Sequence, residues 1–140
     1  MRPMTFKHSL VMAAAIAAAA LAGAASPAQA APPVGNPVAG KAAFAACANC
    51  HQVGPSARSG FGPQLNGIVG RPAGALAGYA YSASMKNAKI IWTEPALAAF
   101  IQAPNEVVPG TKMRFWSLGY NEQKIADLLA YLRSFEAARS

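Results

Sequence analysis

The amino-acid sequence predicts one all-α domain with three main helices and long connecting loops. Its 140 residues are enough for a single domain with a modest core. Three stretches repeat apolar residues at the three- and four-residue steps of a helix that buries one face. Around Cys47, where an α/β protein would need a strand, there is no run of β-branched residues. These observations favour helices without a sheet.

The first helix is predicted from about Val38 to Asn49. Gly40 is small enough to permit a close crossing with another helix, and Phe44 lies one turn later on the same face. We therefore expect this face to pack against a second helix.

The second helix is predicted to begin after Thr93, whose hydroxyl can cap it, with Pro95 in the first turn. Pro104 should end it, because proline cannot continue a helix. Its buried face is predicted to contain Leu97, Phe100 and Ile101.

The last helix has the clearest pattern. Asn121 can cap its first turn. Its apolar residues repeat at helical spacing and form one face along its full length: Ile125, Leu128, Leu129, Leu132 and Phe135.

Residues 1–30 have the three parts of a secretory signal. Arg2 and Lys7 supply the basic start, residues 10–25 are apolar, and small residues lead to Ala30. A membrane anchor is the alternative, but the apolar run is 16 residues and mostly alanine, whereas a span needs about 20 strongly apolar residues. We predict cleavage after Ala30 and a periplasmic location.

Cleavage would leave residues 31–140 with ten basic and five acidic residues, a formal charge of +5. The basic residues are scattered, which argues against nucleic acid and favours an acidic protein partner. Residues 31–38 form a Pro-rich leader without apolar periodicity, which we expect to be flexible. The folded domain is predicted over residues 39–138.

The chain contains only two cysteines, Cys47 and Cys50, and His51 follows directly. This C-x-x-C-H spacing is typical of covalent haem attachment. Each thiol can form a thioether to a haem vinyl group, and the histidine can then ligate the iron. A haem also explains the predicted loops Gln52–Ser59 and Val69–Ala88, which would be unusually long in a helical domain without a ligand.

Two other interpretations of the cysteine pair are a disulfide or thioredoxin-like redox pair and half of a zinc site. Zinc would need four ligands, but the predicted mature chain offers two cysteines and one histidine, because His8 lies in the signal segment. A thioredoxin-like motif would follow a strand, which the sequence around Cys47 does not predict.

The haem iron needs a second axial ligand or an open position. The predicted mature chain has two methionines, Met85 and Met113. Met113 follows Pro109 and Gly110, which mark a tight turn that can hold a thioether towards a ligand. Met85 has no such turn, so we interpret it as a core residue.

From about Gly40 to Phe135 the chain resembles class I cytochrome c, of the subgroup that includes mitochondrial cytochrome c and its bacterial relatives. The motifs occur in the family's order and nearly at its spacing. They are Gly40-Lys41-Ala42-Ala43-Phe44, Cys47 to His51, Gly62-Pro63-Gln64-Leu65, Gly70-Arg71, Tyr79-Ala80-Tyr81-Ser82, Ile91-Trp92 and Pro109-Gly110-Thr111-Lys112-Met113.

The resemblance implies the cytochrome c fold, with helices and loops wrapped around one covalent haem. It implies His51 and Met113 as axial ligands, with the Pro63 carbonyl accepting a hydrogen bond from His51 and Thr111 anchoring the turn before Met113. It places Gly40 and Phe44 against Leu128 and Tyr131. It also assigns three donors to the haem propionates: Arg71, Tyr81 and Trp92.

The chain departs from the family pattern at two places. Phe100 stands where many relatives have a tyrosine near the methionine sulfur. Residues 114–119 lack the glycine that usually follows two residues after the phenylalanine, and this segment is one residue longer than in relatives. We expect the exposed flank near Phe115 to be shaped differently.

With both axial positions filled, the iron can only change its oxidation state, which favours a one-electron carrier over an enzyme. We expect a monomer that meets acidic donor and acceptor proteins, without membrane insertion after cleavage. Four lysines are the predicted docking charges: Lys41, Lys86, Lys89 and Lys112. The alternatives are a haem subunit of a larger oxidoreductase and a haem sensor in which Met113 detaches.

Overall fold

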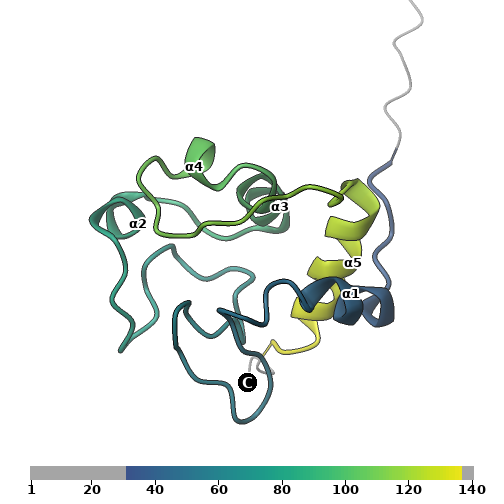
Figure 1. Cartoon of the computed structure of the whole chain (residues 1–140), viewed down its shortest axis with the longest axis horizontal. Coiled ribbons are helices and arrows are strands. Elements are labelled where there is room, and N and C mark those ends of the chain that lie inside the picture. The colour runs from purple at the N-terminus through teal and green to yellow at the C-terminus, as the bar shows by residue number, and fades with distance from the viewer. Residues whose placement is uncertain (1–30, 137–140) are drawn as a thin grey trace, which may run out of the picture. The chain divides into compact units, whose positions relative to one another are not determined.

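The computed structural model describes residues 31–136 (Figure 1). The predicted signal segment, residues 1–30, and residues 137–140 lie outside the described residues. Within residues 31–136 there are helices and no named strand, only an isolated bridge between Pro72 and Ile91. The all-α prediction is therefore confirmed. The helices are α1 (Pro37–Phe44), α2 (Ala83–Asn87), α3 (Glu94–Gln102), α4 (Pro104–Val107) and α5 (Glu122–Arg133).

Helix α1 begins where the sequence predicts but ends earlier. The Asn36 side chain accepts hydrogen bonds from the backbone N–H groups of Val38 and Ala39 at 2.8 and 3.3 Å, which caps the first turn. The helix ends at Phe44, so the predicted end at Asn49 is wrong. Residues 45–50 instead form successive turns, which reorient the chain just before His51.

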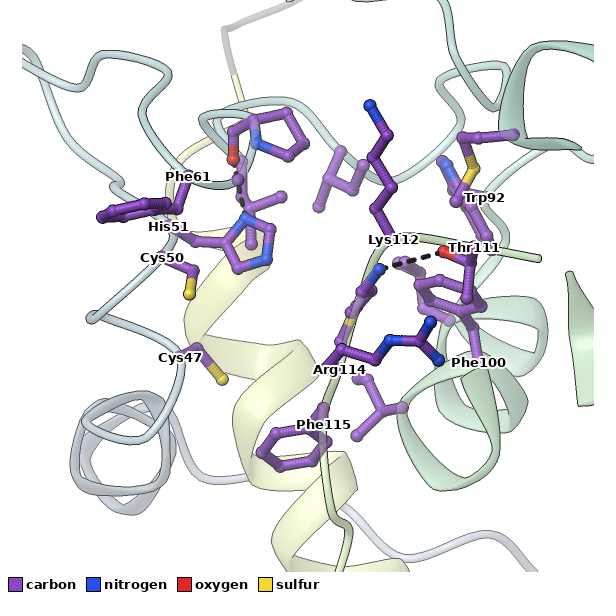
Figure 2. Close-up of a pocket in the computed structure, with 18 of the residues that line it drawn as sticks. Cys47, Cys50, His51, Phe61, Trp92, Phe100, Thr111, Lys112, Arg114 and Phe115 are labelled. Carbon is purple, nitrogen blue, oxygen red and sulfur yellow. Dashed lines mark hydrogen bonds between the residues drawn. The ribbon is translucent and has the colours of Figure 1, made fainter. Parts of the chain in front are cut away.

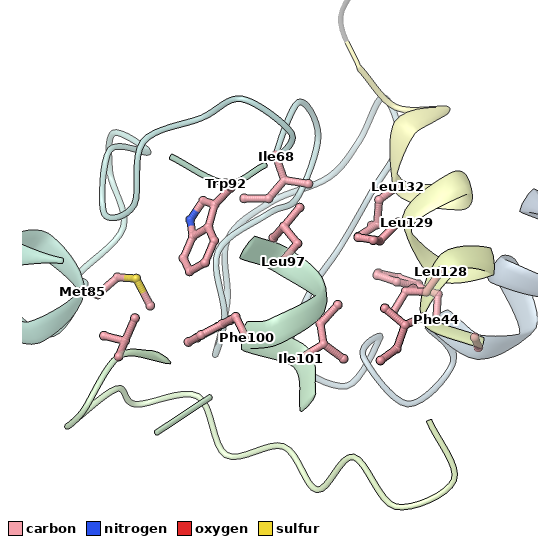
Figure 3. Packing of buried hydrophobic residues seen from close by; sticks show 13 residues of the cluster. Phe44, Ile68, Met85, Trp92, Leu97, Phe100, Ile101, Leu128, Leu129 and Leu132 are labelled. Atoms are coloured by element: carbon pink, nitrogen blue, oxygen red, sulfur yellow. The ribbon is translucent and has the colours of Figure 1, made fainter. Parts of the chain in front are cut away.

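Helices α1 and α5 cross in close contact (Figure 1). A Cβ atom on Gly40 would lie 1.9 Å from the carbonyl oxygen of Asp127 and 2.8 Å from the Tyr131 Cβ. The rings of Phe44 and Tyr131 are 5.5 Å apart, and Figure 3 shows Phe44 beside Leu128, which is 1% exposed. The expected contacts between the first and last helices are therefore present.

The end of the leader is bound to α5. The backbone N–H of Asn36 donates to Asp127 Oδ1 at 2.8 Å, and Gln123 Nε2 donates to the carbonyl of Val34 at 2.9 Å. A Cβ atom on Gly35 would lie 2.1 Å from the carbonyl oxygen of Ala126. Residues 34–38 therefore differ from the free leader that their composition predicts, because they are fixed on α5 or belong to α1.

Helix α3 confirms its prediction. Thr93 Oγ1 accepts a hydrogen bond from the backbone N–H of Ala96 at 3.3 Å, and Pro95 lies in the first turn. The helix ends at Gln102, before Pro104. Pro104 also begins the short helix α4, which was not predicted. The residues that α3 buries are the predicted Leu97, Phe100 and Ile101.

Helix α5 begins after Asn121, whose side-chain oxygen accepts from the backbone N–H of Lys124 at 2.9 Å. Four of the predicted apolar residues are buried: Ile125, Leu128, Leu129 and Leu132. Phe135 lies beyond the end of the helix at Arg133, and its ring stacks edge-on against Tyr131 with centroids 5.0 Å apart.

The predicted loop Val69–Ala88 is wrong at its C-terminal end, which forms α2. Ser82 caps this helix by accepting a hydrogen bond from the backbone N–H of Met85 at 3.1 Å. Met85 is buried in the core, as its interpretation as a packing residue implied. A helix of five residues has too little periodicity to be seen in a sequence.

The buried residues form one cluster that includes residues of α1, α2, α3, α5 and the loops between them (Figure 3). Leu128, Leu129 and Leu132 of α5 pack with Phe44, whereas Trp92 and Phe100 lie towards Met85. The rings of Trp92 and Phe100 are 4.9 Å apart. Among the described residues, no helix is long and apolar enough to cross a membrane.

Candidate functional site: the cavity around His51

The C-x-x-C-H segment is folded by its own backbone hydrogen bonds. The N–H of Cys47 donates to the carbonyl of Phe44 at 2.8 Å, and the N–H of His51 donates to the carbonyl of Cys47 at 2.9 Å. These turns bring both thiols and the imidazole to the same side of the cavity (Figure 2). The two cysteines are not joined to each other.

The imidazole of His51 is held by the loop that follows it. His51 Nδ1 donates a hydrogen bond to the carbonyl of Pro63 at 2.7 Å, since a carbonyl oxygen can only accept. This bond fixes the ring and leaves Nε2 free to ligate a metal, as outer partners of metal-bound histidines do. The expected contact between Pro63 and His51 is thus present.

Gly62 makes this loop geometry possible. A Cβ atom at this position would lie 2.5 Å from His51 Cε1 and 2.7 Å from His51 Nδ1. The loop can therefore approach the imidazole this closely only where no side chain is present. The nearby Gly60 has nothing within 4 Å of an added Cβ, so the two glycines differ in what they permit.

We predict that Gly62→Ala displaces the His51 ring and alters the absorption spectrum and reduction potential of the expected haem. The physical reason is the overlap with Cε1 and Nδ1, which the small loop can relieve only by moving the ring or the Pro63 carbonyl. Potentiometry and visible spectra measure the effect, with Gly60→Ala as the matched control. Identical potentials for both variants would contradict the role given to Gly62.

The cavity has a volume of about 380 Å³, within the range of cofactor pockets. Its walls are mostly apolar and come from α1, α2, α3, α5 and the loops. Such a lining suits a large, flat and apolar macrocycle, and the two thiols and one imidazole at one wall supply the groups for attaching a haem. The residues present therefore fit this cofactor.

Met113 lines the cavity, in a segment whose residues Thr111, Lys112 and Arg114 lie across from His51 (Figure 2). Gly110 has a φ of 80° and its N–H donates to Asn105 Oδ1 at 3.1 Å, which forms the predicted turn. Thr111 is 2% exposed, and its hydroxyl accepts a hydrogen bond from the backbone N–H of Met113 at 3.2 Å (Figure 2). The structure thus brings Met113 and His51 to one cavity from segments more than sixty residues apart.

The three predicted propionate donors differ in whether they line the cavity. Tyr81 and Trp92 line the cavity. Arg71 does not; its guanidinium donates to the carbonyls of Asn66 and Gln64, both at 3.2 Å. Arg71 therefore braces the loop that contains Gln64 and Asn66, and it lies near Tyr81 without lining the cavity.

Burial shifts the pKa values of several titratable groups at the site. Desolvation lowers the pKa of His51, and the hydrogen bond to Pro63 opposes this only in part, so burial favours the neutral form of the ring. Desolvation raises the pKa of the Cys47 thiol to about 11, and Cys50 adds to this effect. Burial raises the pKa of Tyr81 and keeps its O–H available as a donor, and burial lowers the pKa of Arg71.

Sequence reasoning missed much of the cavity wall. Phe100, singled out as a departure from the family pattern, lines the cavity beside Trp92 (Figure 2). Leu65 was named only within a family motif, and Phe115 only as part of an exposed flank. Other apolar wall residues were predicted only as helix core or not at all: Phe61, Ile68, Leu97, Ile101, Leu128 and Leu132. Helical periodicity identified the faces of α3 and α5 but did not indicate that the two faces share a ligand cavity.

A family model described as Cytochrome c matches residues 37–136. Cytochrome c2 of Rhodoblastus acidophilus is 46% identical over 103 residues, which are 74% of this chain and 95% of that protein. Cytochrome c-550 of Nitrobacter winogradskyi is 43% identical over 102 residues, 73% of this chain and 93% of that one.

Solved structures agree with these relatives. Cytochrome cH from Methylobacterium extorquens has a TM-score of 0.66 and 38% identity, over 71% of this chain and 99% of that one. Cytochrome c2 from Rhodospirillum centenum has a TM-score of 0.67 and 35% identity, over 74% of this chain and all of that one. The resemblance inferred from the sequence motifs is confirmed. The chain therefore belongs to the cytochrome c family, carries one covalently bound c-type haem and is an electron-transfer protein.

Proposed function

We propose that this protein is a periplasmic one-electron carrier whose haem is attached through Cys47 and Cys50 and ligated by His51 and Met113. The observation that carries the proposal is the convergence of these four side chains on one apolar cavity. Each is presented by a turn whose backbone hydrogen bonds are satisfied within the chain. The site is therefore built before any partner is met.

When bound, the haem supplies an iron centre that changes its charge by one electron. Residues of the chain orient the iron ligands, offer hydrogen-bond donors and keep water away from the site. Pro63 orients the His51 ring, and Thr111 holds the backbone of Met113. Tyr81 and Trp92 offer O–H and N–H donors to the propionates, while the apolar walls exclude water. In this proposal Arg71 acts through the loop carbonyls it binds.

Two protein ligands leave no open position on the iron, which supports a carrier over a catalyst or a ligand sensor. Among the described residues no cluster of three or more His, Cys, Asp or Glu side chains could hold a separate metal ion. A sensor would require Met113 to leave the iron. Carbon monoxide binding to the reduced wild-type protein at neutral pH distinguishes that alternative, and copurification distinguishes a subunit of a larger oxidoreductase.

The attachment is tested by acid-acetone extraction of protein produced with haem-maturation machinery. We expect the colour to stay with the wild-type chain, because thioether bonds survive extraction, and to be lost from the Cys47→Ser/Cys50→Ser variant. Reduced and oxidised visible spectra of the retained haem should show sharp low-spin bands. A wild-type chain that becomes colourless would overturn the proposal and return the cysteines to a thiol or disulfide role.

The proposed location is tested by the N-terminus of the exported protein. We expect mass spectrometry of the periplasmic fraction to give a mature chain that begins at Ala31, because the small residues Ala28 and Ala30 suit a signal peptidase site. Replacing Ala30 by a bulky residue such as Phe should block this cleavage. A membrane-bound chain of full length in the wild type would indicate a retained anchor instead.

Partner docking is proposed to use positive charge, and the predicted lysines are not equivalent in this respect. Lys112 lines the cavity, so its charge lies beside the haem site. Lys41 is exposed on α1 and Lys86 on α2, and neither lines the cavity. Arg114, which was not among the predicted docking residues, lines the cavity together with Lys112 (Figure 2).

A further inference from the structure

Residues 112–118 alternate between an inner and an outer face. Met113, Phe115 and Ser117 are partly buried, whereas the residues between them are exposed. This period of two is that of an extended chain, in which successive side chains point to opposite sides. The outer face consists of Lys112, Arg114, Trp116 and Leu118, and we call it the outer face of 112–118.

The outer face carries two large apolar side chains in water. Trp116 is 87% exposed and Leu118 is 95% exposed. Single exposed apolar residues are common, but an exposed tryptophan and leucine two residues apart form a patch of the kind that marks an interaction site. No packing within the described residues accounts for either side chain.

This segment is fixed to the domain, which gives the patch a defined position. The Ser117 hydroxyl donates to the carbonyl of Gln102 at 2.9 Å, which ties the segment to the end of α3. The Tyr120 hydroxyl donates to the carbonyl of Ala43 in α1. The rings of Phe115 and Tyr120 meet edge-on with centroids 5.1 Å apart. The inward residues are therefore anchored, and this holds the outer face towards solvent.

The outer face is continuous with the haem cavity. A groove of about 190 Å³ lies along it, between Trp116 and the start of α4 at Pro104 and Asn105. Three of the residues that line this groove also line the haem cavity: Met113, Arg114 and Phe115. A group bound in the groove would thus lie next to the Met113 wall of the haem site.

The segment beside the groove is positively charged. Arg114 lines the groove, and Lys112, two residues earlier on the same face, lines the haem cavity. Residues 107–121 contain no acidic residue, although Glu106 follows the groove-lining Asn105. An apolar patch beside two cations fits a protein surface with an apolar depression and an acidic rim. The concave groove, lined by an arginine and a tryptophan, is suited to one inserted side chain, which favours a protein over a flat lipid surface.

We propose that the outer face of 112–118 is a docking surface for an acidic redox protein, with Trp116 and Leu118 as its apolar anchors and Lys112 and Arg114 as its steering charges. The proposal rests on the proposed carrier function and adds the surface through which a partner is selected. Aromatic and arginine side chains are the residues that most often dominate binding at such interfaces.

The test is stopped-flow reduction of the oxidised haem protein by flavodoxin hydroquinone, an acidic protein that donates single electrons. The variant is Trp116→Ser/Leu118→Ser, and the control is Val38→Ser, which removes an apolar side chain that is also largely exposed but lies on α1. We expect the double variant to lower the second-order rate constant about tenfold and the control to leave it within about twofold. Ascorbate, a small reductant, should reduce all three proteins equally.

Each other outcome has a defined meaning. An unchanged flavodoxin rate in the double variant overturns the docking surface. If vesicles of phosphatidylcholine and phosphatidylglycerol bind the wild type but not the double variant, while the flavodoxin rate is unchanged, the face is a lipid contact and the proposal is also overturned. A wild-type protein that neither ascorbate nor flavodoxin reduces would instead contradict the carrier function.

Discussion

Replacing Gly40 with alanine is expected to destabilise the folded protein by about 3 kcal/mol, a large share of the stability of a small domain. The added Cβ would lie 1.9 Å from the Asp127 carbonyl oxygen and 2.6 Å from its carbon. Both atoms belong to the backbone of α5, so no side-chain rotation relieves the overlap and the two helices must separate. Alanine's better helix propensity returns only about 1 kcal/mol.

Equilibrium unfolding of the haem protein in guanidinium chloride, followed by circular dichroism, measures this loss. Gly60→Ala is the matched control, because an added Cβ there meets nothing within 4 Å. The control should change stability by less than about 1 kcal/mol. If Gly40→Ala is as stable as the control, α1 and α5 can move apart without a loss of stability. The close contact would then not be needed for the fold.

Replacing Met113 with alanine is expected to open one axial position of the haem iron. Met113 lines the same cavity as His51, and Thr111 holds its backbone N–H at 3.2 Å. Alanine keeps this backbone but removes the thioether, and within residues 31–136 no other methionine is presented by a turn at the cavity. We expect the reduced variant to bind carbon monoxide at pH 7, where the wild type does not, and its low-spin spectrum to change.

Met85→Leu is the control for this prediction. Met85 is also a methionine that lines the cavity, but it is buried in the core cluster, so leucine conserves its volume and costs less than about 1.5 kcal/mol. Its spectrum should remain that of the wild type. A Met113→Ala protein with wild-type bands and no carbon monoxide binding would exclude Met113 as the ligand. Carbon monoxide binding by the wild type would favour the sensor alternative.

Local patterns carried most of the information that the sequence held about the fold. Thr93 and Asn121 each cap the helix that the sequence predicts to follow them. The apolar spacing in α3 and α5 identified their buried faces, because burial on one side of a helix forces a period of about 3.6 residues. Short elements were missed, since α2 and α4 have five and four residues and no full period.

The sequence by itself determined the cofactor chemistry of this protein. Two cysteines and a histidine in C-x-x-C-H spacing, followed far along the chain by Pro109-Gly110-Thr111-Lys112-Met113, specify haem attachment through residue types and local turns. Their meaning depends on a few neighbouring residues, which a sequence displays directly. The expectation of a cytochrome c fold followed from the order of such motifs.

Only the tertiary structure decided which distant groups meet. It bound Val34 and Asn36 to α5 and placed Arg71 on the carbonyls of Gln64 and Asn66. It also required a glycine at position 62, beside the His51 ring. It also turned the outer face of 112–118 towards solvent. Such contacts depend on how elements far apart in sequence pack within a few tenths of an ångström, and no local pattern of residue types encodes that distance.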